Sequence, residues 1–176
     1  MRRTSLSTLT GVASLAAVLS VTVLPGVATA ASAASASTGT SATTQYVNPL
    51  AAGTTTSCYG QRWGVLHAGV DLAAAEGTDI LAVAAGTVIA AGWNYSGYGI
   101  SVVIDHGDGY YTHYAHMNAT SVTAGQQVAA GAVLGQEGST GDSTGPHLHF
   151  EVHEGSLWNQ IDPAPWLAER GIETGC

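Results

Sequence analysis

The chain has 176 residues, with four Lys or Arg against twelve Asp or Glu, so its formal net charge is −8. Lysine is absent. The surface therefore offers no basic patch for nucleic acid or for an anionic membrane, and we expect neither as a partner. The length leaves room for one domain with a single core.

The first 30 residues are typical of a secretory signal peptide. Two arginines precede an apolar run over residues 15–27, and the segment ends in small residues. We expect cleavage after Ala30, with Ala33 and Ala36 as alternative sites. A retained membrane anchor is the competing interpretation, which the small residues and the Pro-Gly pair near the end disfavour. We therefore expect a secreted, extracellular protein without stable membrane association after cleavage.

Residues 31–44 consist almost wholly of Ala, Ser, Thr and Gly, with too little bulky apolar surface to offset the entropy of ordering. We expect a flexible linker there and one folded domain over residues 45–176. From residue 31 onward only Arg62 and Arg170 remain against the twelve acids, which gives a formal charge of −10. A substrate would then be recognised by groove shape and hydrogen bonds more than by counter-charge.

Within this domain, short apolar runs alternate with turn signals, a pattern that favours a β-sandwich or barrel with very little helix. Residues 80–91 predict two strands hinged at Gly86. Residues 100–105 and 110–116 predict a hairpin. Only residues 165–170 predict a short helix.

One predicted strand carries two histidines two positions apart. In a strand, alternate side chains share a face. The apolar face would be Leu148, Phe150 and Val152, and the polar face His147, His149, Glu151 and His153. One metal ion could use one or both of the first two histidines. The alternative is a solvated polar face, and a second cluster of metal-binding residues would decide between them.

Such a cluster lies at His67-Ala-Gly-Val-Asp71. Gly69 and Val70 favour a strand, in which His67, Gly69 and Asp71 share a face and the glycine leaves room for an ion. Zinc binds imidazole nitrogen and carboxylate oxygen, with three protein ligands and one open position in catalytic sites. The two segments are therefore interpreted as halves of one site.

The predicted hairpin adds a further histidine to the candidates. Alternation puts Tyr114 and His116 on one face and His113 on the other, and only one face can reach the site. We favour His116, which ends its strand. His106 and His153 are expected to be ordinary surface residues.

These residues resemble the lysostaphin-type (LytM-like) zinc metalloendopeptidases over nearly the whole domain. The matching motifs, in family order, are Tyr59-Gly-x-Arg-Trp63, His67-x-Gly-x-Asp71, Tyr114-Ala-His116, Gly125-Gln-x-Val-x-x-Gly131 and Gly138-Ser-Thr-Gly-x-Ser-Thr-Gly-Pro-His-Leu-His-Phe150. The resemblance implies a two-sheet antiparallel β fold, a sandwich and barrel hybrid with a groove over one sheet. It also implies hydrolysis of peptide cross-links or bridges of bacterial peptidoglycan, and therefore action at the cell wall.

Residue by residue, the resemblance implies a Zn²⁺ ion held by His67, Asp71 and His149, with His116 and His147 as catalytic histidines that do not bind it. Zinc would activate a bound water, and the two histidines would move its proton. Residues 45–176 would then be the catalytic domain. Glu151 either supports a ligand from behind or is exposed to solvent.

The sequence departs from the family at one position. Some members place an oxyanion-stabilising tyrosine six residues before the first ligand histidine, and here that residue is Gln61. Arg62, Tyr59 and Tyr114 are the candidate replacements.

Two other function classes remain to be weighed. A non-catalytic relative that binds peptidoglycan or activates another hydrolase is the main alternative, although such members typically lose ligands that this chain retains. A biotinyl- or lipoyl-carrier module needs an acceptor lysine, which is absent. A structural zinc site usually has four protein ligands, often cysteines.

Cys58 and Cys176 are the only cysteines. In an exported domain the compartment favours oxidation, so we expect them to form an intramolecular disulfide in a monomer. Two free thiols or an intermolecular bond are the alternatives.

Overall fold

The computed structural model describes residues 45–176, and the predictions for residues 1–30 and 31–44 lie outside the described residues. The described part is an antiparallel β structure with one short helix, which confirms the predicted fold class. The elements are β1 Thr54–Ser57, β2 Gly60–Arg62, β3 Val65–His67, β4 Val70–Ala73, β5 Asp79–Leu81, β6 Gly86–Tyr95, β7 Gly99–Asp105, β8 Tyr110–Thr120, β9 Gln127–Val128, β10 Val133–Glu137, β11 Leu148–Glu154, β12 Gln160–Ile161 and α1 Pro163–Ala168.

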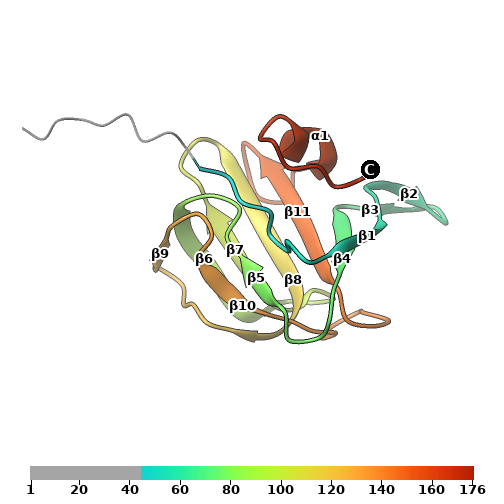
Figure 1. The fold of residues 1–176 in the computed structure, drawn as a ribbon, viewed down its shortest axis with the longest axis horizontal. Coiled ribbons are helices and arrows are strands. Elements are labelled where there is room, and N and C mark those ends of the chain that lie inside the picture. The colour runs from blue at the N-terminus through green and yellow to red at the C-terminus, as the bar shows by residue number, and fades with distance from the viewer. Residues whose placement is uncertain (1–44) are drawn as a thin grey trace, which may run out of the picture. The chain divides into compact units, whose positions relative to one another are not determined.

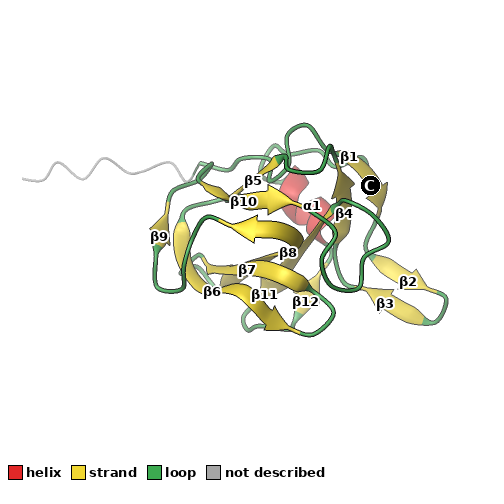
Figure 2. Cartoon of the chain, turned by 90° about the horizontal axis from the view of Figure 1, so that it is seen from below, coloured by secondary structure: helices red, strands yellow, loops and turns green. Residues whose placement is uncertain are grey.

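The main sheet runs in the order β1-β4-β11-β8-β7-β6-β9, and all of its neighbouring strands are antiparallel. β12 adds to β11, while β10 joins β5 to the end of β8. β2 and β3 form a separate hairpin that projects from the domain (Figures 1 and 2). β11 therefore lies inside the sheet, between β4 and β8.

The predicted elements are largely confirmed. β5 and β6 are the two strands expected around Gly86, and β7 and β8 are the expected hairpin. Helix α1 begins two residues before the predicted start because Asp162 caps it: its side chain accepts a hydrogen bond from the Ala164 N–H at 3.0 Å. Proline suits the first helical position, since it lacks the N–H that would be unpaired there.

The apolar face predicted for β11 is confirmed, because Leu148, Phe150 and Val152 are all buried in the core. Phe150 packs edge-on against Tyr114 of β8, with ring centroids 5.3 Å apart. Ile80 of β5 and Leu134 of β10 belong to the same apolar cluster. The β5–β10 pair therefore contributes to the same core.

β8 changes its partner strand at His116. Residues 110–115 pair with β11, whereas residues 117–120 pair with β10. On the β7 side, Ala115 and His116 together lie opposite the single residue Ser101, which is a β-bulge. His116 has a φ of 61°, the left-handed region that non-glycine residues rarely adopt. The bulge turns this side chain out of the strict alternation of β8.

The predicted strand from His67 to Asp71 is wrong as a single element. β3 ends at His67 in the hairpin, β4 begins at Val70 in the main sheet, and Ala68-Gly69 connects them. A Cβ at Gly69 would lie 2.4 Å from the Phe150 carbonyl oxygen and 3.0 Å from the His149 ring. The glycine therefore makes room for β11 and its histidine.

The predicted disulfide is confirmed by the structure, which bonds Cys58 to Cys176. The Thr55 hydroxyl of β1 also donates to the Thr174 carbonyl oxygen. The C-terminal segment is thereby fastened to the chain just ahead of β2. Within residues 45–176, no helix is long and apolar enough to cross a lipid bilayer.

We predict that the disulfide contributes about 4 to 5 kcal/mol of stability, because it closes a loop with a sequence separation of 118 residues. Urea unfolding of the Cys58→Ser/Cys176→Ser variant should show this loss against the oxidised wild type. Wild type with a reducing agent is the control and should lose the same amount. Equal midpoints in all three samples would contradict the prediction.

Gly69→Ala should destabilise the domain by about 1 to 3 kcal/mol, the usual cost of forcing a methyl group into a packed site. Gly145→Ala is the matched control, because an added methyl there meets no atom within 4 Å. Thermal unfolding measures both. A Gly69→Ala midpoint equal to that of the control would show that the close approach to β11 is not required.

Candidate metal centre and active-site pocket

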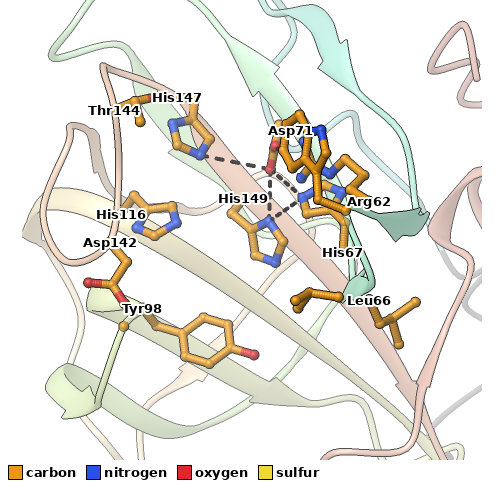
Figure 3. Close-up of a pocket in the computed structure, with 13 residues that line it drawn as sticks. Arg62, Leu66, His67, Asp71, Tyr98, His116, Asp142, Thr144, His147 and His149 are labelled. Carbon is orange, nitrogen blue, oxygen red and sulfur yellow. Dashed lines mark hydrogen bonds and ion pairs between the residues drawn. The ribbon is translucent and has the colours of Figure 1, made fainter.

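Three side-chain atoms of the residues predicted as zinc ligands converge near the start of β11 (Figure 3). His149 Nδ1 lies 2.7 Å from Asp71 Oδ1, and His67 Nε2 lies 3.0 Å from the same oxygen. The two histidine nitrogens are 3.1 Å apart. Asp71 and His149 are directly paired across β4 and β11, so sheet register brings these two together.

The backbone fixes the orientation of the His67 ring. Its Nδ1 lies 2.8 Å from the carbonyl oxygen of Cys58. A carbonyl can only accept, so Nδ1 carries the proton and Nε2 presents a lone pair to Asp71 and His149. Cys58 is also the residue bonded to Cys176, which connects the disulfide directly to this ring.

A carboxylate fixes the orientation of the His149 ring, through Nε2 and not through Nδ1. Its Nε2 lies 3.1 Å from Glu151 Oε1, two positions further along the same face of β11. When Nε2 donates to this carboxylate, Nδ1 presents its lone pair to Asp71 and His67. His67 and His149 therefore use different nitrogens toward a common point.

This arrangement fits a metal ion. Two imidazole nitrogens and one carboxylate oxygen meet within 3.1 Å, and such a group is stabilised by positive charge between them, either a metal ion or a proton. Zinc ligands each lie about 2.0 to 2.2 Å from the ion, which in a tetrahedron separates them by roughly 3.3 Å. The separations between the three atoms are close to that value.

The pKa shifts reflect the same demand for positive charge, which a proton can meet when no ion is bound. Burial alone would lower the pKa of His149, but the hydrogen bonds that its doubly protonated ring can donate to Asp71 and Glu151 raise it to about 9. Burial would raise the pKa of Asp71, but the hydrogen bonds that His149 and His67 can donate in that state hold it well below its usual value. The carboxylate is therefore ionised at neutral pH. A bound cation would displace these protons and leave both histidine nitrogens as ligands.

The two remaining predicted histidines stand beside this cluster, with ring centroids 4.7 Å apart. His116 Nδ1 lies 2.8 Å from the Thr140 carbonyl oxygen, and His147 Nδ1 lies 2.8 Å from the Gly145 carbonyl oxygen. Each ring is therefore protonated at Nδ1 and keeps Nε2 as a base. His147 Nε2 lies 3.8 Å from Asp71 Oδ1, further away than either His67 or His149.

Burial lowers the pKa of His116 to about 4, although the hydrogen bond to Thr140 opposes the shift. Its ring is therefore neutral near pH 7 and able to accept a proton.

All five predicted site residues are brought together by the fold, including His116, which strand alternation alone would have turned into the core beside Tyr114.

A pocket of about 630 Å³ opens over these residues. One wall is the β2–β3 hairpin, whose tip is formed by Trp63 and Gly64 with φ of 49° and 82°, the positive values of a type I′ turn. Trp63 is 97% exposed and lines the pocket together with Leu66. The opposite wall includes Tyr98, Asp142 and Thr144. The site therefore lies at the base of an open groove with an apolar rim.

The three candidates for the missing tyrosine separate clearly. Tyr114 is fully buried, and its hydroxyl accepts the Val83 N–H at 2.9 Å, so it cannot reach the pocket. Tyr59 does not line it. Arg62 does, with its Nη2 3.5 Å from Asp71 Oδ2. Arg62 is also the only cationic side chain in the described residues that lines this pocket.

The prediction that His153 is an ordinary surface residue is wrong. His153 is 0% exposed, because Trp158 covers it and donates its backbone N–H to His153 Nδ1 at 3.1 Å. His106 is half-buried, with Nδ1 2.8 Å from the Ala85 carbonyl oxygen. Alternation puts His113 on the face of its strand opposite to His116, which predicts that it lies outside the site. In the structure that face points toward Glu151, and the His113 ring is fully buried there.

Sequence reasoning missed Tyr98, which lines the pocket from the loop between β6 and β7 and donates its hydroxyl to Glu151 Oε1 at 2.9 Å. No local pattern points to it. Of the two readings of Glu151, the exposed one is wrong, because this side chain is 0% exposed.

The chain is similar to several known proteins. The chain is 43% identical over 134 residues to the DD-carboxypeptidase/endopeptidase Mpg of Neisseria meningitidis, covering 70% of this chain and 30% of Mpg. It is 36% identical over 121 residues to the murein hydrolase activator EnvC of Escherichia coli, covering 65% of this chain and 27% of EnvC. The chain thus spans less than a third of the length of these curated relatives.

Among solved structures, the catalytic domain of the antimicrobial peptidase lysostaphin from Staphylococcus simulans superimposes with a TM-score of 0.63 at 35% identity. The match covers 66% of this chain and 92% of that domain. The family model for peptidase family M23 matches residues 65–163, from the start of β3 to the start of α1. This segment carries His67, Asp71, His116, His147 and His149, and the chain belongs to peptidase family M23.

Proposed function

We propose that this protein is a secreted zinc endopeptidase that hydrolyses peptide cross-links or bridges of bacterial peptidoglycan. The observation that carries the proposal is the meeting of two imidazole nitrogens and one carboxylate oxygen within 3.1 Å at the base of an open groove. In this proposal residues 45–176 are the catalytic domain, residues 31–44 a linker and residues 1–30 a signal peptide.

His67 Nε2, Asp71 Oδ1 and His149 Nδ1 would hold the ion. When bound, zinc supplies a Lewis acid that polarises the scissile carbonyl and lowers the pKa of a bound water toward about 7. Asp71 contributes one negative charge to the ion, and three protein ligands are the number typical of catalytic zinc.

His116 and His147 would move the protons. Each ring is held through Nδ1 by a backbone carbonyl, so Nε2 is the atom that accepts a proton from the attacking water. The Nε2 atom that has taken up the proton then donates it to the leaving amine. Proton transfer by a positioned side chain of this kind accelerates a reaction by about a hundredfold to ten-thousandfold.

We propose that Arg62 stabilises the negative charge that develops on the carbonyl oxygen of the substrate. It lines the pocket, it cannot lose its proton, and its contact with Asp71 Oδ2 at 3.5 Å keeps it beside the metal ligands. Charge that develops in a transition state is stabilised by donors that are already held in place, and Arg62 is such a donor.

The relatives and the surface support the proposed substrate and location. Mpg is by name an endopeptidase. The apolar rim of Trp63 and Leu66 suits a peptide of low charge. The net charge of −8 disfavours binding of a polyanion. The disulfide fits an oxidising compartment outside the cytoplasm. We expect the domain to act there as a monomer.

The second candidate function is that of a non-catalytic activator of another hydrolase, which the similarity to EnvC raises. A protein of that kind would not need the acid–base pair beside the ligands. Here His116 and His147 are both present, with their Nδ1 atoms held and their Nε2 atoms unblocked. This observation favours catalysis.

We predict that purified protein digests peptidoglycan, that chelation abolishes the digestion and that added zinc restores it. Mass spectrometry of the released fragments identifies the bond that is cut. The activator alternative predicts instead that the pure protein leaves peptidoglycan intact and raises the rate of a second hydrolase. Full activity in a rigorously zinc-free sample would end the proposal.

Alanine variants should separate the two kinds of histidine. His67→Ala and His149→Ala should lose both zinc and activity, because each removes a ligand. His116→Ala and His147→Ala should retain zinc and lower kcat by about a hundredfold to ten-thousandfold. Zinc content by atomic absorption and initial hydrolysis rates measure the two effects.

His106→Ala is the control for loss of a histidine, since His106 lies in the β7–β8 turn and contacts none of the five site residues. It should keep both zinc and kcat. A metal-free His147→Ala protein together with a zinc-loaded His149→Ala protein would mean that the two residues have exchanged roles.

A further inference from the structure

Glu151 is a buried carboxylate directly behind the proposed metal centre. It lies on β11 two residues beyond His149, and its side chain is 0% exposed. Three donors surround it: His149 Nε2 lies 3.1 Å and the Tyr98 hydroxyl 2.9 Å from Oε1, and His153 Nε2 lies 2.6 Å from Oε2. A buried carboxylate with this many donors is built into the fold.

The proton positions in this network can be assigned from its outer end. The backbone N–H of Trp158 donates to His153 Nδ1, so that nitrogen is an acceptor and the proton of a neutral His153 is on Nε2. Nε2–H therefore donates to Glu151 Oε2. Tyr98 can only donate its O–H to an ionised carboxylate, and His149 Nε2–H completes the set. Each donor of Glu151 is thus fixed in direction.

From this geometry we infer that Glu151 is a positioning residue for the metal site. Its carboxylate keeps His149 protonated on Nε2, so that Nδ1 is the nitrogen that faces Asp71 and His67. Through the Tyr98 hydroxyl it also holds a side chain of the pocket wall. The inference rests on the proposed function in assuming that His149 binds the ion.

Charge supports the same role. A divalent cation at His67, Asp71 and His149 is balanced by two carboxylates, Asp71 in contact with it and Glu151 behind His149. A ligand histidine that donates its other N–H to a carboxylate becomes a better base, and removal of such a partner typically costs about 10- to 100-fold in metal affinity or activity.

A competing role for Glu151 is that of a ligand in a second metal site, because ligand atoms of His113, Glu151 and His153 lie within 4.8 Å of one another. Two observations oppose it. His153 Nδ1 is occupied by the Trp158 N–H, and its Nε2 carries the proton given to Glu151. A second ion would also add two positive charges to a fully buried cluster whose one carboxylate already serves His149.

The test compares Glu151→Gln with the matched control Glu137→Gln. Glu137 is also 0% exposed, but its Oε1 accepts the Ala74 N–H at 2.9 Å and it contacts none of the proposed ligands. Zinc affinity is measured by competition with a chelator, without substrate. Glu151→Gln should bind zinc about 10- to 100-fold more weakly than wild type. Glu137→Gln should bind it as wild type does.

Two further readouts distinguish positioning from general support of the fold. The ¹⁵N resonances of the His149 ring in the zinc-loaded protein should report a protonated Nε2 in wild type and an altered ring in Glu151→Gln. The thermal midpoint gained on adding zinc should shrink in Glu151→Gln, because this gain depends on affinity. A merely structural role would lower the metal-free midpoint and leave the zinc-induced gain unchanged.

Should Glu151→Gln fail to fold, Tyr98→Phe removes one donor of Glu151 at the pocket edge. It should weaken zinc binding by about two- to tenfold, the usual net effect of one hydrogen bond. Wild-type affinity and an unchanged His149 ring signal in Glu151→Gln, or in Tyr98→Phe where Glu151→Gln does not fold, would overturn the inference. So would two zinc ions per wild-type chain with only one lost in Glu151→Gln, which would make Glu151 a ligand itself.

These outcomes are separate from those that test the proposed function. A wild-type chain that binds one zinc ion but leaves peptidoglycan intact would end the endopeptidase proposal, and the affinity comparison for Glu151 would stand. Hydrolysis with zinc affinity unchanged in Glu151→Gln would end only the role of Glu151.

Discussion

The register between β4, β11 and β8 is the constraint on which the site depends. β11 is the central strand of these three, and His149 is paired with Asp71 on one side and with Ala115 on the other. A shift of one residue in either pairing would turn His149 into the core, because side chains alternate between the faces of a strand. The core holds the register through Leu148, Phe150 and Val152, and so the apolar face of β11 positions the polar one.

Much of this could be predicted from the sequence. The alternation in β11 and the turn signals around β7 and β8 are local patterns, and both led to elements that the structure contains. The imidazole and carboxylate side chains singled out by their spacing lie together in one pocket. The predictions that failed concern residues whose burial depends on distant segments. His153 and Glu151 are buried only because Trp158 and Tyr98, from two different loops, cover the polar face of β11. No spacing within the strand contains that information.

His116 lies in the pocket, although strand alternation by itself does not place it there. In a regular strand His116 would share the core face of Tyr114. The bulge opposite Ser101 and the φ of 61° rotate it toward His147, at the point where β8 exchanges β11 for β10. The exchange of partner strand and the delivery of a histidine to the pocket are therefore one structural event. Bulges commonly occur beside active sites, where they re-aim a side chain.

The division of labour among the four pocket histidines follows from what each ring touches on its far side. His67, His116 and His147 give the Nδ1 proton to backbone carbonyl oxygens, whereas His149 gives the Nε2 proton to Glu151. All four thus turn a bare nitrogen inward, and protonation alone does not distinguish ligand from base. Distance to Asp71 does: the nitrogens of His149 and His67 lie 2.7 and 3.0 Å from Oδ1, and that of His147 lies 3.8 Å away. The histidine given a carboxylate partner is also the one nearest to Asp71, where a more basic ring binds a cation most strongly.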